Sequence, residues 1–324
     1  MVFFNLLILA MGFAVLVKGA DIFVDGSAGL ARFFKVPSLV IGLTIVACGT
    51  SMPELAVSTS AAIAGADEIA LSNVVGSNIF NLLGILGLCA LIYKLPVETV
   101  VLKRDYSVTV FSSIGVMLVL AVPAFLKGGF FHLQMEELAA VVARWMGIVL
   151  LAVYVIYVIF LIIDARKNSV NNDEKAPPLW KSIAFIAAGL GLVILGGQLV
   201  VTSSQKIARF FGMTETLIGL TIVAIGTSLP ELVTSLAASR KGNSALAIGN
   251  VIGSNIFNLL FILGASAVIR PVGVNAASMY DLAVLVVVSI MGWIFSVTKK
   301  QIGRFEGFLM LLLYAAETVF AIVR

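Results

Sequence analysis

Long apolar runs with few charged residues recur along the whole chain. Residues 106–126 read YSVTVFSSIGVMLVLAVPAFL, and residues 138–163 read LAAVVARWMGIVLLAVYVIYVIFLII. Runs of about 20 apolar residues are long enough to cross a bilayer as helices. Because 60% of the residues are hydrophobic and only 12% are charged, too few polar residues remain to cover a soluble core. The sequence therefore predicts an all-α polytopic membrane protein.

Ten transmembrane helices are expected, near residues 2–30, 37–64, 70–93, 106–126, 138–163, 180–204, 214–239, 244–268, 281–297 and 305–323. The first run has neither a basic leader nor a small-residue cleavage site, so we expect a membrane span rather than a signal peptide. A polar linker at 164–180 divides the chain into two five-helix units, residues 1–163 and 181–324.

Basic residues are distributed unequally between alternate loops. Most of them, including Arg32, Lys103 and Arg166, fall in the set of loops that contains the 164–180 linker. Positively charged loops favour the cytoplasm, which predicts a multi-pass protein of the cell membrane with a cytoplasmic linker and both termini outside. This explains the net charge of +4 without a nucleic-acid partner. The lipid bilayer is the expected surrounding, and no obligate protein partner is expected.

An acidic motif occurs twice. GTSMPE at 49–54 recurs as GTSLPE at 226–231, and 231 minus 54 is 177. The same offset aligns SNVVGSNIFNLLGILG (72–87) with GNVIGSNIFNLLFILG (249–264) without gaps. The two halves are therefore related by internal duplication. Because each half has an odd number of spans, the second must enter the membrane upside down. Such inverted repeats are typical of secondary transporters, whose sites lie near the midplane.

Each motif breaks a helix at membrane depth. Pro53 and Pro230 have no backbone N–H, so a carbonyl one turn earlier loses its helical partner. Such carbonyls are tolerated in the membrane only where protein, water or an ion satisfies them. Glu54 and Glu231 are costly to bury without a cation. The motifs therefore predict a cation site.

Hydroxyl and amide side chains accompany the two glutamates. Thr50 and Ser51 lie one turn before Glu54, and Thr227 and Ser228 are their counterparts. The following helices carry a stripe at four-residue spacing: Asn73, Ser77 and Asn81, matched by Asn250, Ser254 and Asn258. Carboxylate, hydroxyl, amide and carbonyl oxygens suit Ca²⁺ and Na⁺ rather than zinc or copper.

Several neighbouring residues admit a structural interpretation. Gly76 and Gly253 are expected to permit close helix packing. Asn78 and Asn255 either hydrogen-bond a broken helix or contact an ion. The first span carries three charged residues whose counterparts in the second half are uncharged: Lys18, Asp21 and Asp25. We therefore expect these three residues to be structural or to face an aqueous gap. Lys18 and Asp21 are spaced to pair on one helix.

The motifs resemble the α-repeats of the sodium/calcium exchanger superfamily, in particular its compact prokaryotic members. The resemblance covers the whole chain and implies an alternating-access antiporter in which Na⁺ and Ca²⁺ compete for one cluster of sites. It implies that Glu54, Glu231 and the carbonyls of Thr50 and Thr227 hold Ca²⁺. The two glutamates would also take part in Na⁺ binding, and the other Na⁺ ligands that it implies are Ala47, Thr50, Ser51, Ser77, Asn81, Ala224, Thr227, Ser228, Ser254 and Asn258.

Asn258 departs from part of this superfamily. Some members, including potassium-dependent relatives, carry Asp at this position, so Asn disfavours potassium dependence and makes the central subsite less negative. Apart from the transported ions, no cofactor is expected. A Ca²⁺/H⁺ exchanger that uses the same glutamates remains an alternative. An intramembrane hydrolase using Ser51 or Ser228 lacks a credible base, because the only histidine, His132, lies in a loop; the protein is not expected to be an enzyme.

Overall fold

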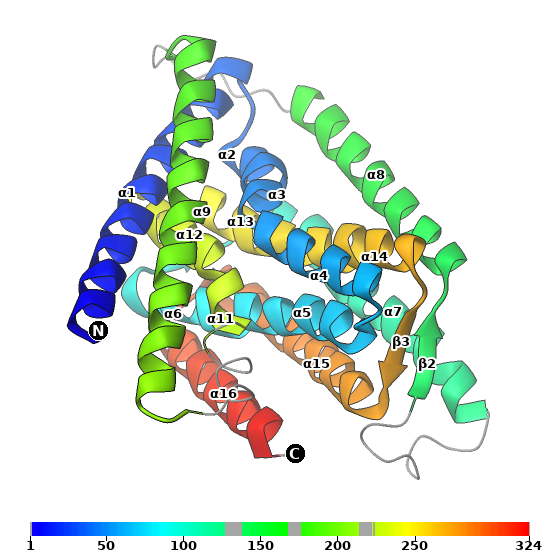
Figure 1. Ribbon diagram of the computed structural model, residues 1–324. Coiled ribbons are helices and arrows are strands. Elements are labelled where there is room, and N and C mark those ends of the chain that lie inside the picture. Colours follow the sequence, from blue (N-terminus) through cyan, green and yellow to red (C-terminus); the bar gives the residue numbers. More distant parts are fainter. Residues whose placement is uncertain (1, 127–137, 168–175, 214–221, 223, 324) are drawn as a thin grey trace.

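The computed structural model describes residues 2–126, 138–167, 176–213, 222 and 224–323, almost all of them helical (Figure 1). Among these residues, eight helices are long and apolar enough to cross a membrane, and a bent pair gives a ninth candidate. The long unbroken ones are α1 (Val2–Phe34), α7 (Tyr106–Leu126), α8 (Arg144–Lys167), α9 (Leu179–Phe210), α15 (Ala276–Lys299) and α16 (Arg304–Val323). The expected span 214–239 begins outside the described residues.

The 177-residue offset also relates the helix boundaries. Helix α5 (Asp67–Ile79), the π-helical turn η2 (Phe80–Ile85) and α6 (Leu86–Ile92) follow one another without a gap. Their counterparts are α13 (Ser244–Ile256), η6 (Phe257–Ile262) and α14 (Leu263–Ile269). Every boundary in the second series is the first plus 177, so the duplication seen in the sequence extends to local backbone structure.

Both acidic motifs break their helices. The first half has α2 (Ser38–Ile41), the π-helical turn η1 (Gly42–Val46) and α3 (Ala47–Thr50), followed after Ser51 by α4 (Met52–Ala64). The two parts are bent by 49°, which confirms the predicted break. The second half has α11 (Ala224–Thr227), then Ser228, then α12 (Leu229–Arg240). Ser51 and Ser228 share a non-helical backbone, with φ/ψ of −83°/12° and −92°/9°.

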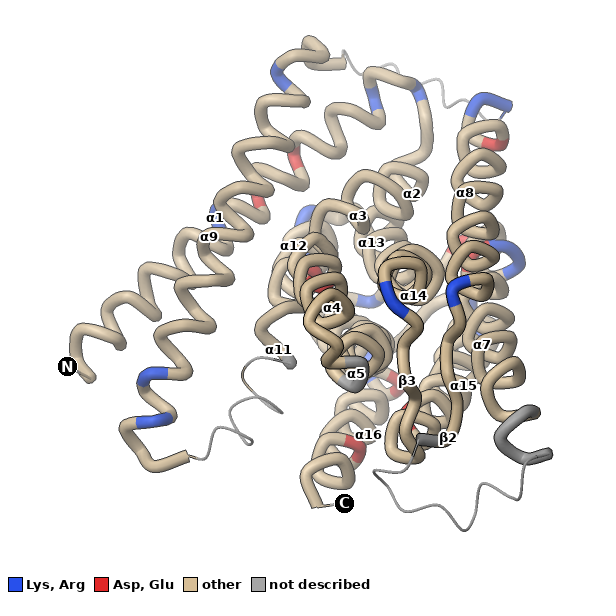
Figure 2. The backbone as a smooth tube through the Cα atoms, turned by 45° about the vertical axis from the view of Figure 1, so that its right-hand side comes forward, with Lys and Arg blue, Asp and Glu red and all other residues tan. Residues whose placement is uncertain are grey.

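Helices α1 and α9 lie side by side along most of their length (Figures 1 and 2). Glycines allow this close approach: a Cβ on Gly189 would lie 2.4 Å from the backbone N of Phe23, and one on Gly196 would lie 2.6 Å from that of Leu16. The pair stands beside a core in which α5 and α13 are the most buried elements. Helix α12 contacts both α1 and α13, so it joins the α1–α9 pair to the core.

Short strands correct one predicted boundary. Residues Leu138–Val142, expected to begin a span, form β2, which pairs antiparallel with β3 (Val272–Asn275). Strand β1 (Leu95–Pro96) pairs with β4 (Gln301–Ile302). Hydropathy could not distinguish LAAVV from the start of a helix, because a short apolar run fits either element. Each strand pair joins the first half to the second, and the π-helical turn η3 (Val101–Asp105) precedes α7.

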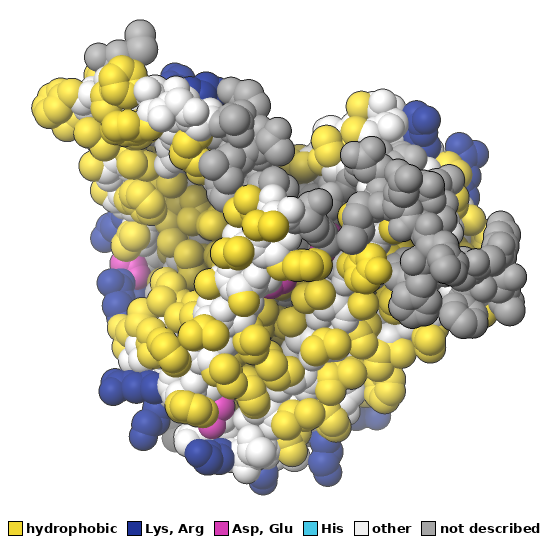
Figure 3. Space-filling model, turned by 90° about the horizontal axis from the view of Figure 1, so that it is seen from below, with side chains coloured by type: hydrophobic (Ala, Val, Ile, Leu, Met, Phe, Trp, Pro, Cys, Tyr) yellow, Lys and Arg dark blue, Asp and Glu magenta, His cyan; other side chains and the backbone are white. Residues whose placement is uncertain are grey.

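The outer surface of the bundle is apolar. Phe111 of α7 is 70% exposed, and Trp145 and Ile156 of α8 are 61% and 66% exposed. Figure 3 shows hydrophobic side chains over much of the face seen from below. Basic residues lie mostly at helix ends and in connections (Figure 2). Contiguous apolar surface of this kind is stable in lipid and not in water, so the chain is an integral membrane protein.

Candidate ion-binding site

The two motif glutamates are the centre of a buried polar cluster. Glu54 and Glu231 are both 0% exposed. Ser228 Oγ donates to Glu54 Oε1 at 2.8 Å, and Ser51 Oγ donates to Glu231 Oε1 at 2.7 Å. Each carboxylate is therefore held by the serine that precedes the proline in the other half. The contact is reciprocal between equivalent residues.

The second oxygen of each carboxylate, Oε2, has no hydrogen-bond partner among the described residues. The same holds for four further buried oxygens on α5, α13 and the turns that follow them: Asn78 Oδ1, Asn81 Oδ1, Ser254 Oγ and Asn258 Oδ1. A buried acceptor without a partner costs about 1–3 kcal/mol, and more when it is charged. These atoms are hard oxygen donors, so a Na⁺ or Ca²⁺ ion in contact with them would remove that cost.

Hydroxyl groups surround both carboxylates. Thr50 Oγ1 lies 3.1 Å from the carbonyl of Val46 and 3.1 Å from Asn250 Oδ1, so it can donate to either. Ser77 Oγ lies 3.2 Å from Ser228 Oγ, which joins it to the Glu54 side of the cluster. Ala47 is fully buried one turn before Thr50. Of the remaining predicted ligands, Thr227 is half-buried at the end of α11, and the side chain of Ala224 lies outside the described residues.

Asn73 and Asn250 hold the broken helices in place. Asn73 Nδ2 donates to the Glu54 carbonyl at 3.1 Å and to Ser58 Oγ at 2.9 Å. Asn250 Nδ2 makes the same two contacts, at 3.3 Å to the Glu231 carbonyl and 2.9 Å to Ser235 Oγ. Sequence reasoning missed the two serines. The repeat could have revealed them, because each serine lies four residues after its glutamate and the two serines are 177 residues apart.

Asn78 and Asn255 join the two halves. Asn78 Nδ2 donates to the Asn255 carbonyl at 3.1 Å, and Asn255 Nδ2 donates to the Asn78 carbonyl at 3.3 Å. Of the two alternatives left open by the sequence, the structure shows hydrogen bonding, although to a central helix rather than a broken one. Asn81 Nδ2 also donates to Asn255 Oδ1 at 2.9 Å. The equivalent donor and acceptor, Asn258 Nδ2 and Asn78 Oδ1, have no partner among the described residues, so the two halves differ here.

Asn81 and Asn258 both lie in π-helical turns, η2 and η6. A π-helical turn inserts one residue into the helical ladder, which redirects the side chains that follow, and such turns are frequent at functional sites. No proline or glycine pattern in the sequence predicted them.

The two packing glycines behave differently. A Cβ on Gly253 would lie 2.7 Å from both the Cα and the carbonyl oxygen of Leu43, so the predicted close packing is confirmed there. A Cβ on Gly76 would meet no described atom within 4 Å, so the described residues show no close packing at this position. The segment corresponding to η1 in the second half, which would face Gly76 by the offset, lies largely outside the described residues.

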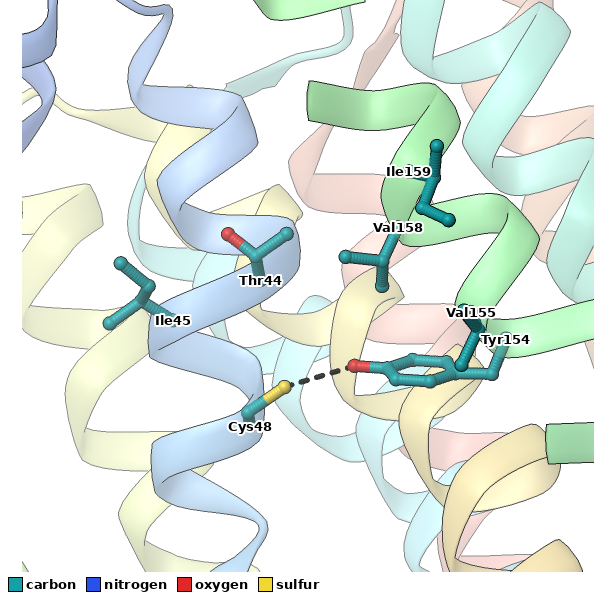
Figure 4. A pocket seen from close by; sticks show the side chains of 7 residues that line it. All are labelled: Thr44, Ile45, Cys48, Tyr154, Val155, Val158 and Ile159. Carbon is teal, nitrogen blue, oxygen red and sulfur yellow. Dashed lines mark hydrogen bonds between the residues drawn. The ribbon is translucent and has the colours of Figure 1, made fainter. Parts of the chain in front are cut away.

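Within the described part of the chain, cavities adjoin the first broken helix on its α8 side and on its α9 side. One of about 330 Å³ lies against α8, where Cys48 Sγ is 3.1 Å from Tyr154 Oη and shares a hydrogen bond with it (Figure 4). The other, of about 380 Å³, lies against α9 and reaches Pro53, Thr227 and Pro230 of the two motifs. The residues that line the second cavity include Pro53 and Pro230, which directly precede Glu54 and Glu231 in the sequence.

Known proteins resemble this chain over nearly its full length. The family described as "Sodium/calcium exchanger protein" matches residues 4–163 and 181–323. The sodium/calcium exchanger MaX1 of Methanosarcina acetivorans is 34% identical, covering 98% of this chain and 99% of its own. Inner membrane protein YrbG of Escherichia coli is 35% identical over 88% of this chain and 86% of its own. A structure of the sodium-calcium exchanger NCX_Mj, soaked with 10 mM Na⁺ and no Ca²⁺, has a TM-score of 0.82 at 32% identity, covering 98% and 99% of the two chains.

Proposed function

Because the chain belongs to the sodium/calcium exchanger family, whose members are cation/Ca²⁺ antiporters, we propose that it exchanges Na⁺ for Ca²⁺ across the cell membrane by alternating access. The observation that carries the proposal is the buried pair Glu54 and Glu231, each held through one oxygen by the other half and each presenting a second oxygen without a described partner. A buried pair of carboxylates matches the charge of one Ca²⁺, and hydroxyl and amide oxygens complete a Na⁺ or Ca²⁺ shell.

The proposed ion ligands follow the cluster. Ca²⁺ is bound by Glu54, Glu231 and the carbonyls of Thr50 and Thr227. Na⁺ is bound by the two symmetry-related sets and the central asparagines: Ala47, Thr50, Ser51, Ser77 and Asn81, with Ala224, Thr227, Ser228, Ser254 and Asn258. Support comes from the burial of most of these residues and from the hydrogen bonds that bring Ser77, Ser228 and Glu54 together. Potassium is not part of the proposed cycle, because both central residues are neutral asparagines.

We further propose ten spans arranged as two inverted five-helix units, residues 1–163 and 181–324, joined by a cytoplasmic linker at 164–180. Support comes from contacts that are reciprocal between equivalent residues, as a two-fold axis produces. The serine–glutamate and asparagine–carbonyl pairs are of this kind. Strand pairing also joins the halves twice: β1 pairs with β4, and β3, which begins 177 residues after β1, pairs with β2.

Tracer uptake tests this function. Purified protein in proteoliposomes loaded with sodium should take up radiolabelled calcium, and potassium-loaded vesicles should not. Acid-loaded vesicles without sodium address the alternative, a Ca²⁺/H⁺ exchanger that uses the same two glutamates. Calcium uptake driven by the pH step alone would show that the protein exchanges Ca²⁺ for H⁺ and not for Na⁺.

Energetics favour three Na⁺ per Ca²⁺. Export against a calcium gradient of about 10⁴ costs about 5.5 kcal/mol, at about 1.4 kcal/mol per tenfold. Two Na⁺ entering down a tenfold gradient supply only about 2.8 kcal/mol, and that exchange is electroneutral. Three Na⁺ supply about 4.2 kcal/mol, and one net charge entering at roughly 100 mV adds about 2.3 kcal/mol. Only the three-sodium cycle exceeds the cost under these gradients.

Uptake by sodium-loaded vesicles should therefore depend on voltage. In this direction three Na⁺ leave for each Ca²⁺ that enters, so each cycle carries one positive charge outward. With the potential clamped by potassium and valinomycin, we expect uptake to accelerate when the interior is positive and to slow when it is negative. The ion gradients at which net calcium flux reverses can also be measured at each clamped potential. If this reversal point does not change with the membrane potential, the three-to-one ratio is contradicted, whichever step limits the rate.

A further inference from the structure

Charged residues connect α1 to the end of α12. Arg240 Nη2 lies 2.5 Å from Asp21 Oδ1, and Lys241 Nζ lies 2.5 Å from Asp25 Oδ1. Lys241 Nζ also donates to the backbone carbonyl of Asp21 at 2.8 Å. Asp21 therefore pairs with Arg240 of α12. The sequence had suggested a pair with Lys18 on the same helix instead. Two carboxylates and two cations from segments more than 200 residues apart form one network.

The equivalent position in the other half has no such network. The counterparts of Asp21 and Asp25 under the 177-residue offset are Gln198 and Thr202 on α9, and those of Arg240 and Lys241 are Ile63 and Ala64. Gln198 and Thr202 line the cavity of about 380 Å³ that reaches Pro53 and Thr227. The two α9 residues equivalent to Asp21 and Asp25 therefore border a cavity, whereas Asp21 and Asp25 on α1 make ion pairs.

Burial of equivalent residues shows the same asymmetry. Met52 lines the α9 cavity and is 39% exposed, whereas its counterpart Leu229 is 9% exposed and packs with Leu16 of α1. Thr227 is half-buried, whereas Thr50 is fully buried. In this conformation a cavity borders both motifs on the α9 side, whereas Leu229 is packed on the α1 side, and we call this arrangement α9-open.

We propose that Asp21 and Asp25 with Arg240 and Lys241 form an ion-pair latch that holds the α1 side of the transport site closed and thereby favours the α9-open conformation. Inverted halves would otherwise give two access states of similar energy, and a contact present in only one of them shifts the population toward it. The inference rests on the proposed alternating-access function. Arg240 and Lys241 fall in the loops that we place in the cytoplasm, so the latch closes the cytoplasmic side.

The rate of thiol labelling measures how accessible the α9 side and the α1 side of the transport site are, and it does not require transport. The native thiols are removed by Cys48→Ala and Cys89→Ala, and single thiols are introduced by Met52→Cys or Leu229→Cys. In sodium- and calcium-free detergent solution, a charged methanethiosulfonate reagent should label Met52→Cys quickly and Leu229→Cys slowly. Adding Asp21→Asn and Asp25→Asn should raise the rate at Leu229→Cys roughly three- to tenfold without raising the rate at Met52→Cys. General loosening of the fold would raise both.

Charge exchange and salt provide the matched controls. Asp25→Lys combined with Lys241→Asp should restore slow labelling of Leu229→Cys, whereas Asp25→Lys alone should not. Glu306→Gln, which removes the acidic partner of Lys299 elsewhere in the molecule, should leave the rate unchanged. Raising ionic strength with choline chloride should accelerate labelling of Leu229→Cys even with all four latch residues intact. A labelling rate that responds neither to neutralisation nor to salt would overturn the latch, and failure of sodium-driven calcium uptake alone would overturn only the proposed function.

Discussion

Glu54→Gln and Glu231→Gln should each abolish calcium uptake by sodium-loaded proteoliposomes, and to a similar extent. Both carboxylates are fully buried, and each occupies the same place in its half of the cluster. Removing one leaves the charge of a dehydrated Ca²⁺ half compensated. Breaking a buried charge pair in this way costs about 3–5 kcal/mol, which corresponds to a loss of at least roughly 100-fold.

The glutamine substitution keeps the shape of the side chain, so the fold is expected to survive. Glu54→Gln can still accept from Ser228 through its amide oxygen, and Glu231→Gln can accept from Ser51. Elution of the variant as a single species in size-exclusion chromatography checks this. Glu306→Gln serves as the charge-matched control, because Glu306 lies beside Lys299 and outside the cluster. Near-normal calcium exchange by either variant would remove that glutamate from the site.

Gly253→Ala should destabilise the protein strongly, whereas Gly76→Ala, at the equivalent position, should not. The new Cβ of Gly253→Ala would lie 2.7 Å from the backbone of Leu43 and 2.8 Å from the Cβ of Ala47. Because backbone cannot move aside, we expect a cost of about 1–3 kcal/mol or more. The Cβ of Gly76→Ala meets no described atom within 4 Å, and alanine is the better helix former by roughly 1 kcal/mol.

The apparent melting temperature of each detergent-purified variant measures this difference. We expect it to fall by several degrees for Gly253→Ala and to stay level or rise for Gly76→Ala. Equal shifts in the two variants would show that α13 does not depend on its close approach to η1. A lowered value for Gly76→Ala alone would reverse the assignment of the packing glycine.

The sequence anticipated those parts of the site that depend on local chemistry. Proline lacks the backbone N–H that a continuous helix needs, so the breaks before Glu54 and Glu231 followed from the motif alone. The burial of both glutamates followed from the apolar context, and the 177-residue offset gave the equivalent elements. These inferences require only the residues within one or two helical turns and a comparison of the chain with itself.

Other features depend on contacts between distant segments, and these the sequence did not indicate. The π-helical turns at Asn81 and Asn258 leave no mark in residue type. Asp21 was spaced to pair with Lys18, but its partner is 219 residues away in Arg240. The strand Leu138–Val142 has the composition of a helix start and becomes a strand because β3 supplies its hydrogen-bond partners. In each case the local structure depends on residues that are distant in the sequence and become neighbours only in the folded protein.

Sodium competition against calcium binding is the most direct test of a single shared site. Titration calorimetry on the purified protein measures the calcium dissociation constant at increasing NaCl, with choline chloride keeping ionic strength constant. If Na⁺ and Ca²⁺ occupy the same cluster around Glu54 and Glu231, the apparent Kd for calcium should rise steeply with sodium, with an exponent above one that approaches three. A calcium Kd that stays constant from zero to saturating sodium would contradict the account.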